Sequence, residues 1–238
     1  MRGIILAAGR GSRMKNLTDD VPKCLLKIEG RPLIEWQINA MREAGIDEIG
    51  IVTGYKREAL SSYGLVEFHN DKWQETNMVS SLSCADEWLK SSACVVSYSD
   101  IFYDSSAVSS LKGSPAEVGI TFDPNWLNLW ANRFDDPLSD AETFRIDRDN
   151  TLLEIGGRAS SVDEIQGQYM GLLRITPKGW VKIQEVRSGL PDLERNKLQM
   201  THLLQKLIAE DRCQISAIPY LGKWGEFDSA DDIVAYAS

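Results

Sequence analysis

Short apolar runs alternate with amphipathic segments through the first half of this chain. An apolar run of four to six residues predicts a buried strand, whereas apolar positions three and four apart predict a helix. On this basis we expect strands at 4–7, 48–53, 66–69 and 93–98, and helices at 32–45, 56–63 and 78–89. Strands that alternate with helices over short connections indicate an α/β fold with a doubly wound, mostly parallel sheet.

The second half of the chain has a less regular pattern. Strand signals fall at 117–122, 144–146, 152–155, 169–175 and 214–219, and helical spacing at 177–186, 196–208 and 230–236. No low-complexity linker divides the chain. We therefore predict one domain over 1–238, with a small insertion at about 123–175 that shapes a substrate site.

The charge balance excludes two classes of partner. The chain has 35 Asp and Glu against 26 Lys and Arg, a formal net charge of −9. It therefore offers no basic surface to nucleic acid or to an anionic membrane. Its apolar runs are shorter than the ~18 residues of a membrane helix, and 4–8 is too short for the apolar part of a signal peptide. We expect a cytoplasmic protein.

Cysteine and histidine usage argues against several kinds of site. The four cysteines lack metal-ligand spacing and mostly lie in apolar surroundings, so we expect reduced, buried thiols at Cys24, Cys84, Cys94 and Cys213. The chain has two histidines, His69 and His202. With so few, a zinc site or a histidine-based catalytic triad is disfavoured.

The strongest candidate site follows the first predicted strand. A loop of small residues, AAGRGSR at 7–13, carries two arginines, and Lys23 follows ten positions after Arg13. Glycines let the backbone approach a polyphosphate and point its N–H groups at the oxygens. Arg13 can donate two hydrogen bonds to one phosphate, and Lys23 adds a compact positive charge. The spacing fits neither the dinucleotide fingerprint nor the P-loop, but the gathered cations indicate an anion site.

Two other segments of the chain carry carboxylates that could bind a metal ion. Asp100 follows the apolar run 93–98, and ligands of doubly wound sheets bind at the carboxyl ends of the strands. Near the C-terminus, Glu226 and Asp228 lie two residues apart, on one face of an extended segment. Carboxylate oxygens are ligands that Mg²⁺ prefers. From the residues alone, a solvated aspartate at a strand end and a helix cap near 228 stay open as alternatives.

Together these motifs resemble one family. LAAGRGSR at 6–13, followed by VPKCL at 21–25, is similar to the signature of the nucleotidyltransferases that make nucleoside-diphosphate sugars and alcohols. The resemblance implies a Rossmann-like fold of the nucleotide-diphospho-sugar transferase type. It also implies that Mg²⁺ is bound by Asp100 and Asp228, with Glu226 beside them.

The reaction that this resemblance implies needs no protein nucleophile. An anionic phosphate or phosphonate oxygen of an acceptor attacks the α-phosphorus of a nucleoside triphosphate in line, and pyrophosphate is released. Arg13 and Lys23 would be the catalytic residues, because they would neutralise charge on the transferring and departing phosphates.

A further stretch favours cytosine as the base. NDKWQETNMVSSL at 70–82 resembles the corresponding stretch of bacterial choline-phosphate cytidylyltransferases, enzymes of cell-surface decoration. The resemblance favours CTP, with other triphosphates open, and makes Asn77 the candidate that reads the pyrimidine edge. A helix N-cap is the alternative role for Asn77. The nucleotide-binding candidates are Leu6, Ala7, Ala8, Gly9, Gly11, Ser12, Asn77 and Asp100.

The candidate acceptor site lies in the predicted insertion. Trp126 and Trp130 are four residues apart, hence on one helical face, and Asp140 and Glu142 follow. Aromatic rings beside carboxylates can hold an ammonium group through cation–π and ionic contacts, although both tryptophans could instead pack the insertion onto the sheet. The insertion departs in sequence from that of the choline enzymes. We expect a small phosphorylated or phosphonated alcohol or amine, of the phosphocholine or 2-aminoethylphosphonate type.

Two other functions stay open. The first is a sugar-1-phosphate nucleotidyltransferase, against which the tryptophan and acid cluster at 126–142 argues. The second is a non-catalytic regulatory subunit, which would be expected to lack one of the residues Arg13, Lys23, Asp100 and Asp228 that are all present here. A homodimer is also open.

Overall fold

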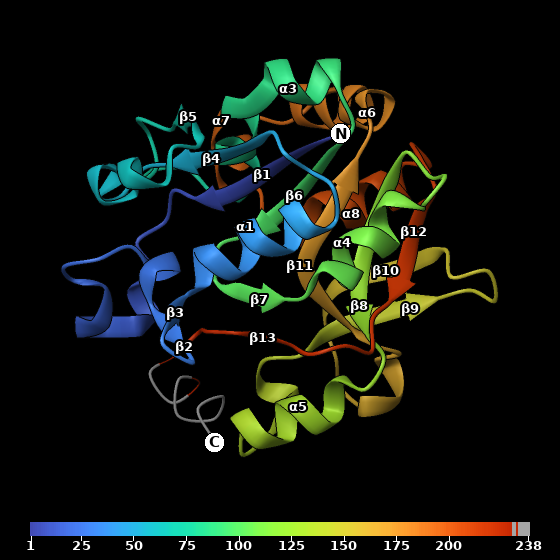
Figure 1. Ribbon diagram of the computed structural model, residues 1–238. Helices are drawn as coiled ribbons and strands as arrows, with labels where there is room; N and C mark the ends of the chain where they lie inside the picture. The colour runs from blue at the N-terminus through green and yellow to red at the C-terminus, as the bar shows by residue number, and fades with distance from the viewer. Residues whose placement is uncertain (230–231, 233–238) are drawn as a thin grey trace.

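The chain folds around a seven-stranded sheet, and the computed structural model describes residues 1–229 and 232. The strands lie in the order β12-β8-β11-β6-β1-β4-β5 (Figure 1). Every residue of β4 and of β8 is buried, as expected of strands covered on both faces. The strands are β1 (Arg2–Ala7), β4 (Ile49–Thr53), β5 (Val66–His69), β6 (Cys94–Tyr98), β8 (Val118–Asp123), β11 (Gln168–Ile175) and β12 (Ile215–Pro219).

Most neighbouring strands of this sheet are parallel. β1 pairs in parallel with β4 and with β6, β4 with β5, and β8 with β12. β11 joins the two groups and is antiparallel to both β6 and β8. The doubly wound, mostly parallel α/β sheet expected from the sequence is therefore confirmed. Because β1 and β6 are parallel neighbours, the loop after β1 lies beside the turn after β6.

Helices pack on the sheet in two groups. α1 contacts α4, and α6 contacts both α3 and α8. Trp180 of α6 is fully buried and its Nε1 donates to Asp86 Oδ1 of α3 at 2.8 Å. The α-helices are α1 (Leu33–Glu43), α2 (Met78–Leu82), α3 (Asp86–Ser91), α4 (Ser105–Lys112), α5 (Trp126–Arg133), α6 (Pro177–Ser188), α7 (Asp192–Lys197) and α8 (Met200–Ala209). The 3-10 helices are η1 (Ser12–Thr18), η2 (Lys23–Leu25), η3 (Arg57–Tyr63), η4 (Ser83–Ala85), η5 (Pro137–Ser139) and η6 (Val162–Glu164).

Small antiparallel ladders flank the central sheet. β9 (Glu142–Ile146) pairs with β10 (Leu152–Arg158), and β2 (Lys27–Ile28) with β3 (Arg31–Pro32). β7 (Ile101–Tyr103) pairs with β13 (Trp224–Glu226), so the C-terminal part of the chain runs beside β7 (Figure 1). The predicted insertion at 123–175 holds α5 and the β9–β10 hairpin, but also β11 of the central sheet. Its boundaries and the single domain stay predictions.

The structure corrects the sequence-based helices at three places. The helix expected at 78–89 is interrupted by η4, where Ser83 Oγ donates to Val79 O at 2.9 Å, a side-chain bond of the kind that bends helices. The helix expected at 196–208 is divided, because Leu198 and Gln199 are extended between α7 and α8. The helix expected at 56–63 is the 3-10 helix η3. The helix expected at 230–236 lies outside the described residues, apart from Asp232.

The structure bears on two features expected from the sequence, the burial of the cysteines and the absence of a membrane helix. Cys24 and Cys94 are buried and Cys213 is partly so, but Cys84 is exposed, which corrects the expectation that it is buried. Cys84 lies in η4, after α2, and its Sγ donates to Ser80 O at 3.9 Å. None of the described helices combines the length and the apolar character that a bilayer crossing requires.

Gly54, directly after β4, has no room for a side chain. A Cβ there would lie 2.6 Å from Ala8 O and 2.6 Å from Trp73 Cβ. We expect Gly54→Ala to lower the free energy of unfolding by about 1–3 kcal/mol, the usual cost of overpacking. Urea denaturation measures this. The matched control is Gly113→Ala, where the nearest atom would be 3.6 Å away; equal losses in both variants would contradict the close approach.

Candidate active site

The loop after β1 is built around a left-handed glycine. Gly11 has φ 68°, and a Cβ there would lie 2.8 Å from Lys23 Cδ, so the loop and the lysine require glycine at this position. Met14 is buried in a small apolar cluster with Phe102 and Phe227. This cluster anchors the start of η1, and it therefore fixes the loop that carries Arg13.

The three candidate metal ligands meet at the β7–β13 ladder. Glu226 lies opposite Ile101, and the Phe227 N–H donates to Asp100 O at 2.9 Å. As a result Asp100, Glu226 and Asp228 each offer a carboxylate oxygen within 4.8 Å of the others. Two segments that are far apart in the sequence thus form one acidic cluster.

Lys23 bridges two of these carboxylates. Its Nζ lies 2.8 Å from Asp100 Oδ2 and 3.3 Å from Asp228 Oδ1, and the residue is 7% exposed. Burial alone would lower the pKa of Lys23, but the carboxylates, Asp100 foremost, raise it above its ordinary value. Lys23 is therefore a fixed positive charge at neutral pH. Arg13 Nη2 also lies 3.1 Å from Asp228 Oδ1, while most of the Arg13 side chain stays exposed.

Gln37 of α1 holds the turn that presents Asp100. Its Nε2 donates to Tyr98 O at 2.9 Å and to Ile101 O at 2.6 Å, and the residue is fully buried. The two acceptors lie on either side of Ser99 and Asp100. No sequence pattern indicates this role, because Gln37 occupies an ordinary position of an amphipathic helix.

The acidic cluster suits a hard divalent cation. Asp100 Oδ1 is buried and has no hydrogen-bond partner among the described residues. Burial and the neighbouring Asp228 and Asp100 carboxylates raise the pKa of Glu226 well above its usual range. Mg²⁺ binds oxygen ligands and is usually held by only one or two protein carboxylates. Three carboxylates, one of which has an oxygen without a hydrogen-bond partner, therefore form a suitable site for Mg²⁺.

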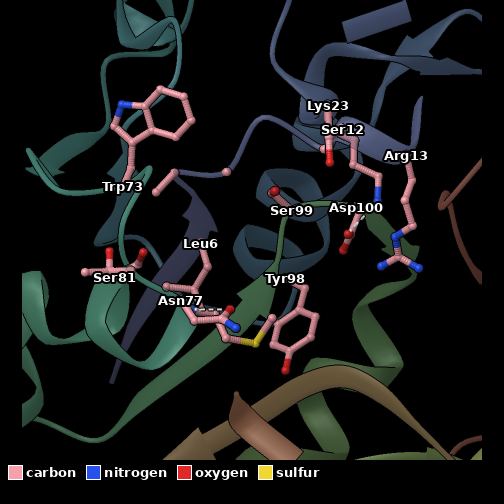
Figure 2. Close-up of a pocket in the computed structure, with 15 residues that line it drawn as sticks. Leu6, Ser12, Arg13, Lys23, Trp73, Asn77, Ser81, Tyr98, Ser99 and Asp100 are labelled. Atoms are coloured by element: carbon pink, nitrogen blue, oxygen red, sulfur yellow. Dashed lines mark hydrogen bonds and ion pairs between the residues drawn. The ribbon is translucent and has the colours of Figure 1, made fainter. Parts of the chain in front are cut away.

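A cavity of about 300 Å³ opens beside the β1 loop. Figure 2 shows Lys23, Arg13, Ser12 and Asp100 toward one end and Trp73 and Ser81 toward the other. The cavity is therefore charged at one end and mixed polar and apolar at the other, as a nucleoside triphosphate requires. Of the nucleotide-binding candidates, those that line it are Leu6, Ala8, Gly9, Gly11, Ser12, Asn77 and Asp100. Ala7 is buried in β1 and is not among the lining residues.

Asn77 lines the cavity and also caps a helix. Its Oδ1 accepts from Met78 N at 2.8 Å at the start of α2, and its Nδ2 donates to Lys197 O at 3.3 Å. Ser81, one turn further on, was not singled out in the sequence. Its Oγ accepts from Asn70 Nδ2 at 3.0 Å, which leaves its hydroxyl hydrogen for an acceptor atom in the cavity.

A second cavity, of about 370 Å³, adjoins the first. The two share Arg13, Asn77, Met78 and Tyr98 in their walls. Glu226 and Asp228 face the second cavity, whereas Lys23 and Asp100 face the first. The acidic cluster and its cations therefore lie where the two cavities meet.

Three of the four acceptor candidates reach the second cavity. Trp130, Asp140 and Glu142 line it, and Trp130 Nε1 donates to Asp140 Oδ2 at 3.1 Å. Trp126 does not line it: the ring is buried and its Nε1 donates to Ile165 O at 3.2 Å. Trp126 thus packs the α5 segment in place, the alternative that the sequence left open.

The far wall of this cavity is acidic. Burial raises the pKa of Asp140 above its ordinary value, and Asp228 adds to the effect. Burial likewise raises the pKa of Glu142, whose Oε1 accepts from Thr201 Oγ1 at 3.4 Å. Two neighbouring, partly buried carboxylates favour a ligand that brings positive charge and N–H donors.

A glycine-rich loop, a buried lysine and an acidic cluster at the carboxyl end of a mostly parallel sheet are the parts of a nucleotidyltransferase. Residues 3–120 match the family model of the MobA-like NTP transferase domain. The CTP:phosphoglutamine cytidylyltransferase of Campylobacter jejuni is 34% identical over 98% of this chain and 98% of its own length. The choline-phosphate cytidylyltransferase of Streptococcus pneumoniae is 40% identical over 39% of this chain and 42% of its own.

The chain belongs to this nucleotidyltransferase family and is an enzyme of that class. Solved structures share its fold. The inositol-1-phosphate CTP transferase of T. maritima superposes with a TM-score of 0.77 at 18% identity, over 99% of this chain and 94% of that one. The CTP:phosphocholine cytidylyltransferase of S. pneumoniae gives 0.73 at 21% identity, over 99% and 97%. The expected nucleotide-diphospho-sugar transferase fold is thereby confirmed.

Lys23 should be indispensable to turnover. We expect Lys23→Ala to lower the rate of pyrophosphate release at least ~10²–10³-fold, the usual loss when a preorganised charge is removed. Nucleotide binding should survive in part, because Arg13 and the loop backbone remain. Steady-state kinetics and nucleotide titration measure the two effects, with Lys27→Ala, at an exposed position of β2, as control. Unchanged turnover in a folded Lys23→Ala variant would contradict the catalytic role.

Proposed function

We propose that this enzyme is a Mg²⁺-dependent cytidylyltransferase that transfers CMP from CTP to a small phosphorylated or phosphonated acceptor bearing a cationic group. The observation that carries the proposal is the junction of two cavities at Lys23, Arg13 and the acidic cluster. The first cavity would hold the triphosphate and the second, with its acidic wall, would hold the acceptor.

The proposed reaction is a direct displacement at phosphorus. An acceptor phosphate oxygen forms a bond to the α-phosphorus of CTP. The bond from that phosphorus to the oxygen that bridges to the β-phosphate breaks, and pyrophosphate leaves with the electron pair. Because the attacking oxygen is already anionic, the chain needs to supply no base. Its work is to place the two anions together and to offset their charge.

Lys23 and Arg13 would offset the negative charge of the substrate phosphates from different positions. Lys23 is buried between the carboxylates at the phosphate end of the first cavity, so it would stay in place as charge moves to pyrophosphate. Arg13 lines both cavities and is mostly exposed, so it could contact phosphate groups of both substrates. Asp100 and Asp228, with Glu226, would hold Mg²⁺, which would supply further positive charge to the reacting phosphates.

The named relatives favour cytidine as the transferred nucleoside, and two side chains at α2 would hold its base. One relative that aligns over nearly all of this chain is a CTP-using enzyme, and three relatives with shorter matches are cytidylyltransferases as well. Ser81 has its hydroxyl hydrogen available in the first cavity and would donate to an oxygen or nitrogen acceptor on the pyrimidine edge. Asn77 would contribute by holding α2 in place beside the base, because its side chain caps that helix.

The acceptor would be a compound with phosphate or phosphonate at one end and an ammonium group at the other. Its anionic end would face Arg13 and the acidic cluster, and its ammonium group would face Asp140 and Glu142. The spread of relatives across phosphoglutamine, choline phosphate and 2-aminoethylphosphonate supports this class of small molecule. The cytoplasmic location, the role in cell-surface decoration and the homodimer stay predictions from the sequence.

Pyrophosphate release across a substrate panel tests this function. We expect release with CTP rather than UTP, GTP or ATP, and with an acceptor such as phosphorylated glutamine, phosphocholine, phosphoethanolamine or 2-aminoethylphosphonate. EDTA should abolish it, and so should Asp100→Asn, whereas the matched variant Asp104→Asn at the exposed cap of α4 should stay active. Release with hexose 1-phosphates alone would instead make the protein a sugar-1-phosphate nucleotidyltransferase.

Glu142 should determine how acceptor binding depends on pH. Since burial raises its pKa above the ordinary ~4.3, lowering the pH should protonate it early and raise the acceptor KM. We expect Glu142→Gln to raise that KM ~10–100-fold at neutral pH, the scale of one charge-assisted hydrogen bond, and to weaken its rise in acid. The KM for CTP should change little. A similar effect in the control Glu154→Gln, a half-exposed residue of β10 outside both cavity walls, would contradict the assignment.

A further inference from the structure

Arg133, the last residue of α5, is a buried cation that lines neither cavity. Its side chain is 1% exposed, and its guanidinium lies 5.3 Å from the Trp130 ring centre and 5.1 Å from that of Phe134. A buried arginine is costly unless acidic groups surround it. Because Arg133 is absent from both cavity walls, it has to act through other side chains.

Its main partner is Asp232. Arg133 Nε lies 2.7 Å from Asp232 Oδ1, and Nη2 lies 3.4 Å from Asp232 Oδ2. The guanidinium also reaches the acidic cluster, with Nη2 3.5 Å from Asp228 Oδ2 and Nη1 3.9 Å from Glu226 Oε2. One buried cation thus contacts two of the three candidate metal ligands and a fourth acid behind them.

Asp232 in turn holds the backbone that carries Asp228. Its Oδ2 accepts from the Asp228 N–H at 2.8 Å and from the Ser229 N–H at 2.7 Å. Burial would raise the pKa of Asp232, but the hydrogen bond from Arg133 and these N–H groups lower it, so the carboxylate stays ionised. The contacts therefore run without a break from α5 through Arg133 and Asp232 to Asp228.

We propose that Arg133 and Asp232 form a positioning pair that fixes the Asp228 carboxylate for metal binding. The pair also links the metal ligands to the acceptor wall, because Arg133 packs on Trp130, whose Nε1 holds Asp140. Neither residue touches substrate or metal in this arrangement. The inference rests on the metal site of the proposed function. It adds to that function the residues that hold the metal ligands in position.

Direct metal titration tests the pair without turnover. Free Mn²⁺, measured by its EPR signal in the presence of protein and no acceptor, gives the dissociation constant. We expect Arg133→Lys, which keeps the buried charge but loses the fork, to weaken Mn²⁺ binding ~10–100-fold, the range found for groups that orient metal ligands. Asp232→Asn should do the same while its amide oxygen still accepts the two backbone N–H bonds.

The double variant shows whether Arg133 and Asp232 position Asp228 together or act independently of each other. If both residues act through Asp228, Arg133→Lys with Asp232→Asn should weaken Mn²⁺ binding no more than the worse single variant. The control Arg57→Met breaks the half-exposed pair with Glu67 and should leave Mn²⁺ affinity unchanged. Circular dichroism establishes that each variant is folded before titration.

Three outcomes would overturn the pair. Unchanged Mn²⁺ affinity in folded Arg133→Lys and Asp232→Asn would remove the positioning role. Multiplicative losses in the double variant would mean separate supports. An equal loss of Mn²⁺ affinity in the control Arg57→Met would mean that the effect is not specific to the pair. None of these depends on which triphosphate or acceptor is used, so failure of the pair and failure of the cytidylyltransferase proposal are separate results.

Discussion

The hydrogen bond from Phe227 N–H to Asp100 O joins the turn after β6 to the C-terminal segment, and the acidic cluster exists only where they meet. The β7–β13 ladder continues this contact, and the buried ring of Phe227 packs beneath it with Met14 and Phe102. The same apolar cluster anchors the loop after β1. A single small ladder therefore sets the positions of the carboxylates and of the cations that face them.

Bringing three carboxylates together is unfavourable unless positive charge accompanies them. Three basic side chains supply that positive charge from three sides of the cluster. Lys23 lies between Asp100 and Asp228 within the site, and Arg133 lies behind it. Arg13 reaches the cluster from the solvent side and remains mostly exposed. Even so, Asp100 Oδ1 is buried without a hydrogen-bond partner among the described residues, a demand that a bound cation would meet.

The sequence was most informative where the chemistry is local. The loop at 7–13 and Lys23 lie close in the chain, so their residue types alone indicated an anion site, and the strands of the parallel half fell within one or two residues of their predicted places. Trp126 and Trp130 illustrate the limit. Their spacing correctly placed them on one helix, but which ring reaches a cavity depends on how α5 lies against β13 and the hairpin, and only Trp130 does.

Residues that act over long sequence separations escaped prediction for the same reason. Gln37 holds the turn of Asp100 from α1, and Asp232 holds Asp228 with the help of Arg133 from α5. Each is an unremarkable polar residue in its own segment. β7 and β13 are three residues long, too short for a periodic signal, and they form because each pairs with the other.

Crystals soaked with Mn²⁺ and a slowly reacting CTP analogue would test the central claim most directly. The anomalous signal of Mn²⁺ should appear against the Asp100 and Asp228 carboxylates, on the side away from Lys23 Nζ, with the triphosphate extending along the loop at 8–13 and the base toward Trp73 and Ser81. A manganese peak elsewhere, or a nucleotide bound with its phosphates away from Lys23, would contradict the account.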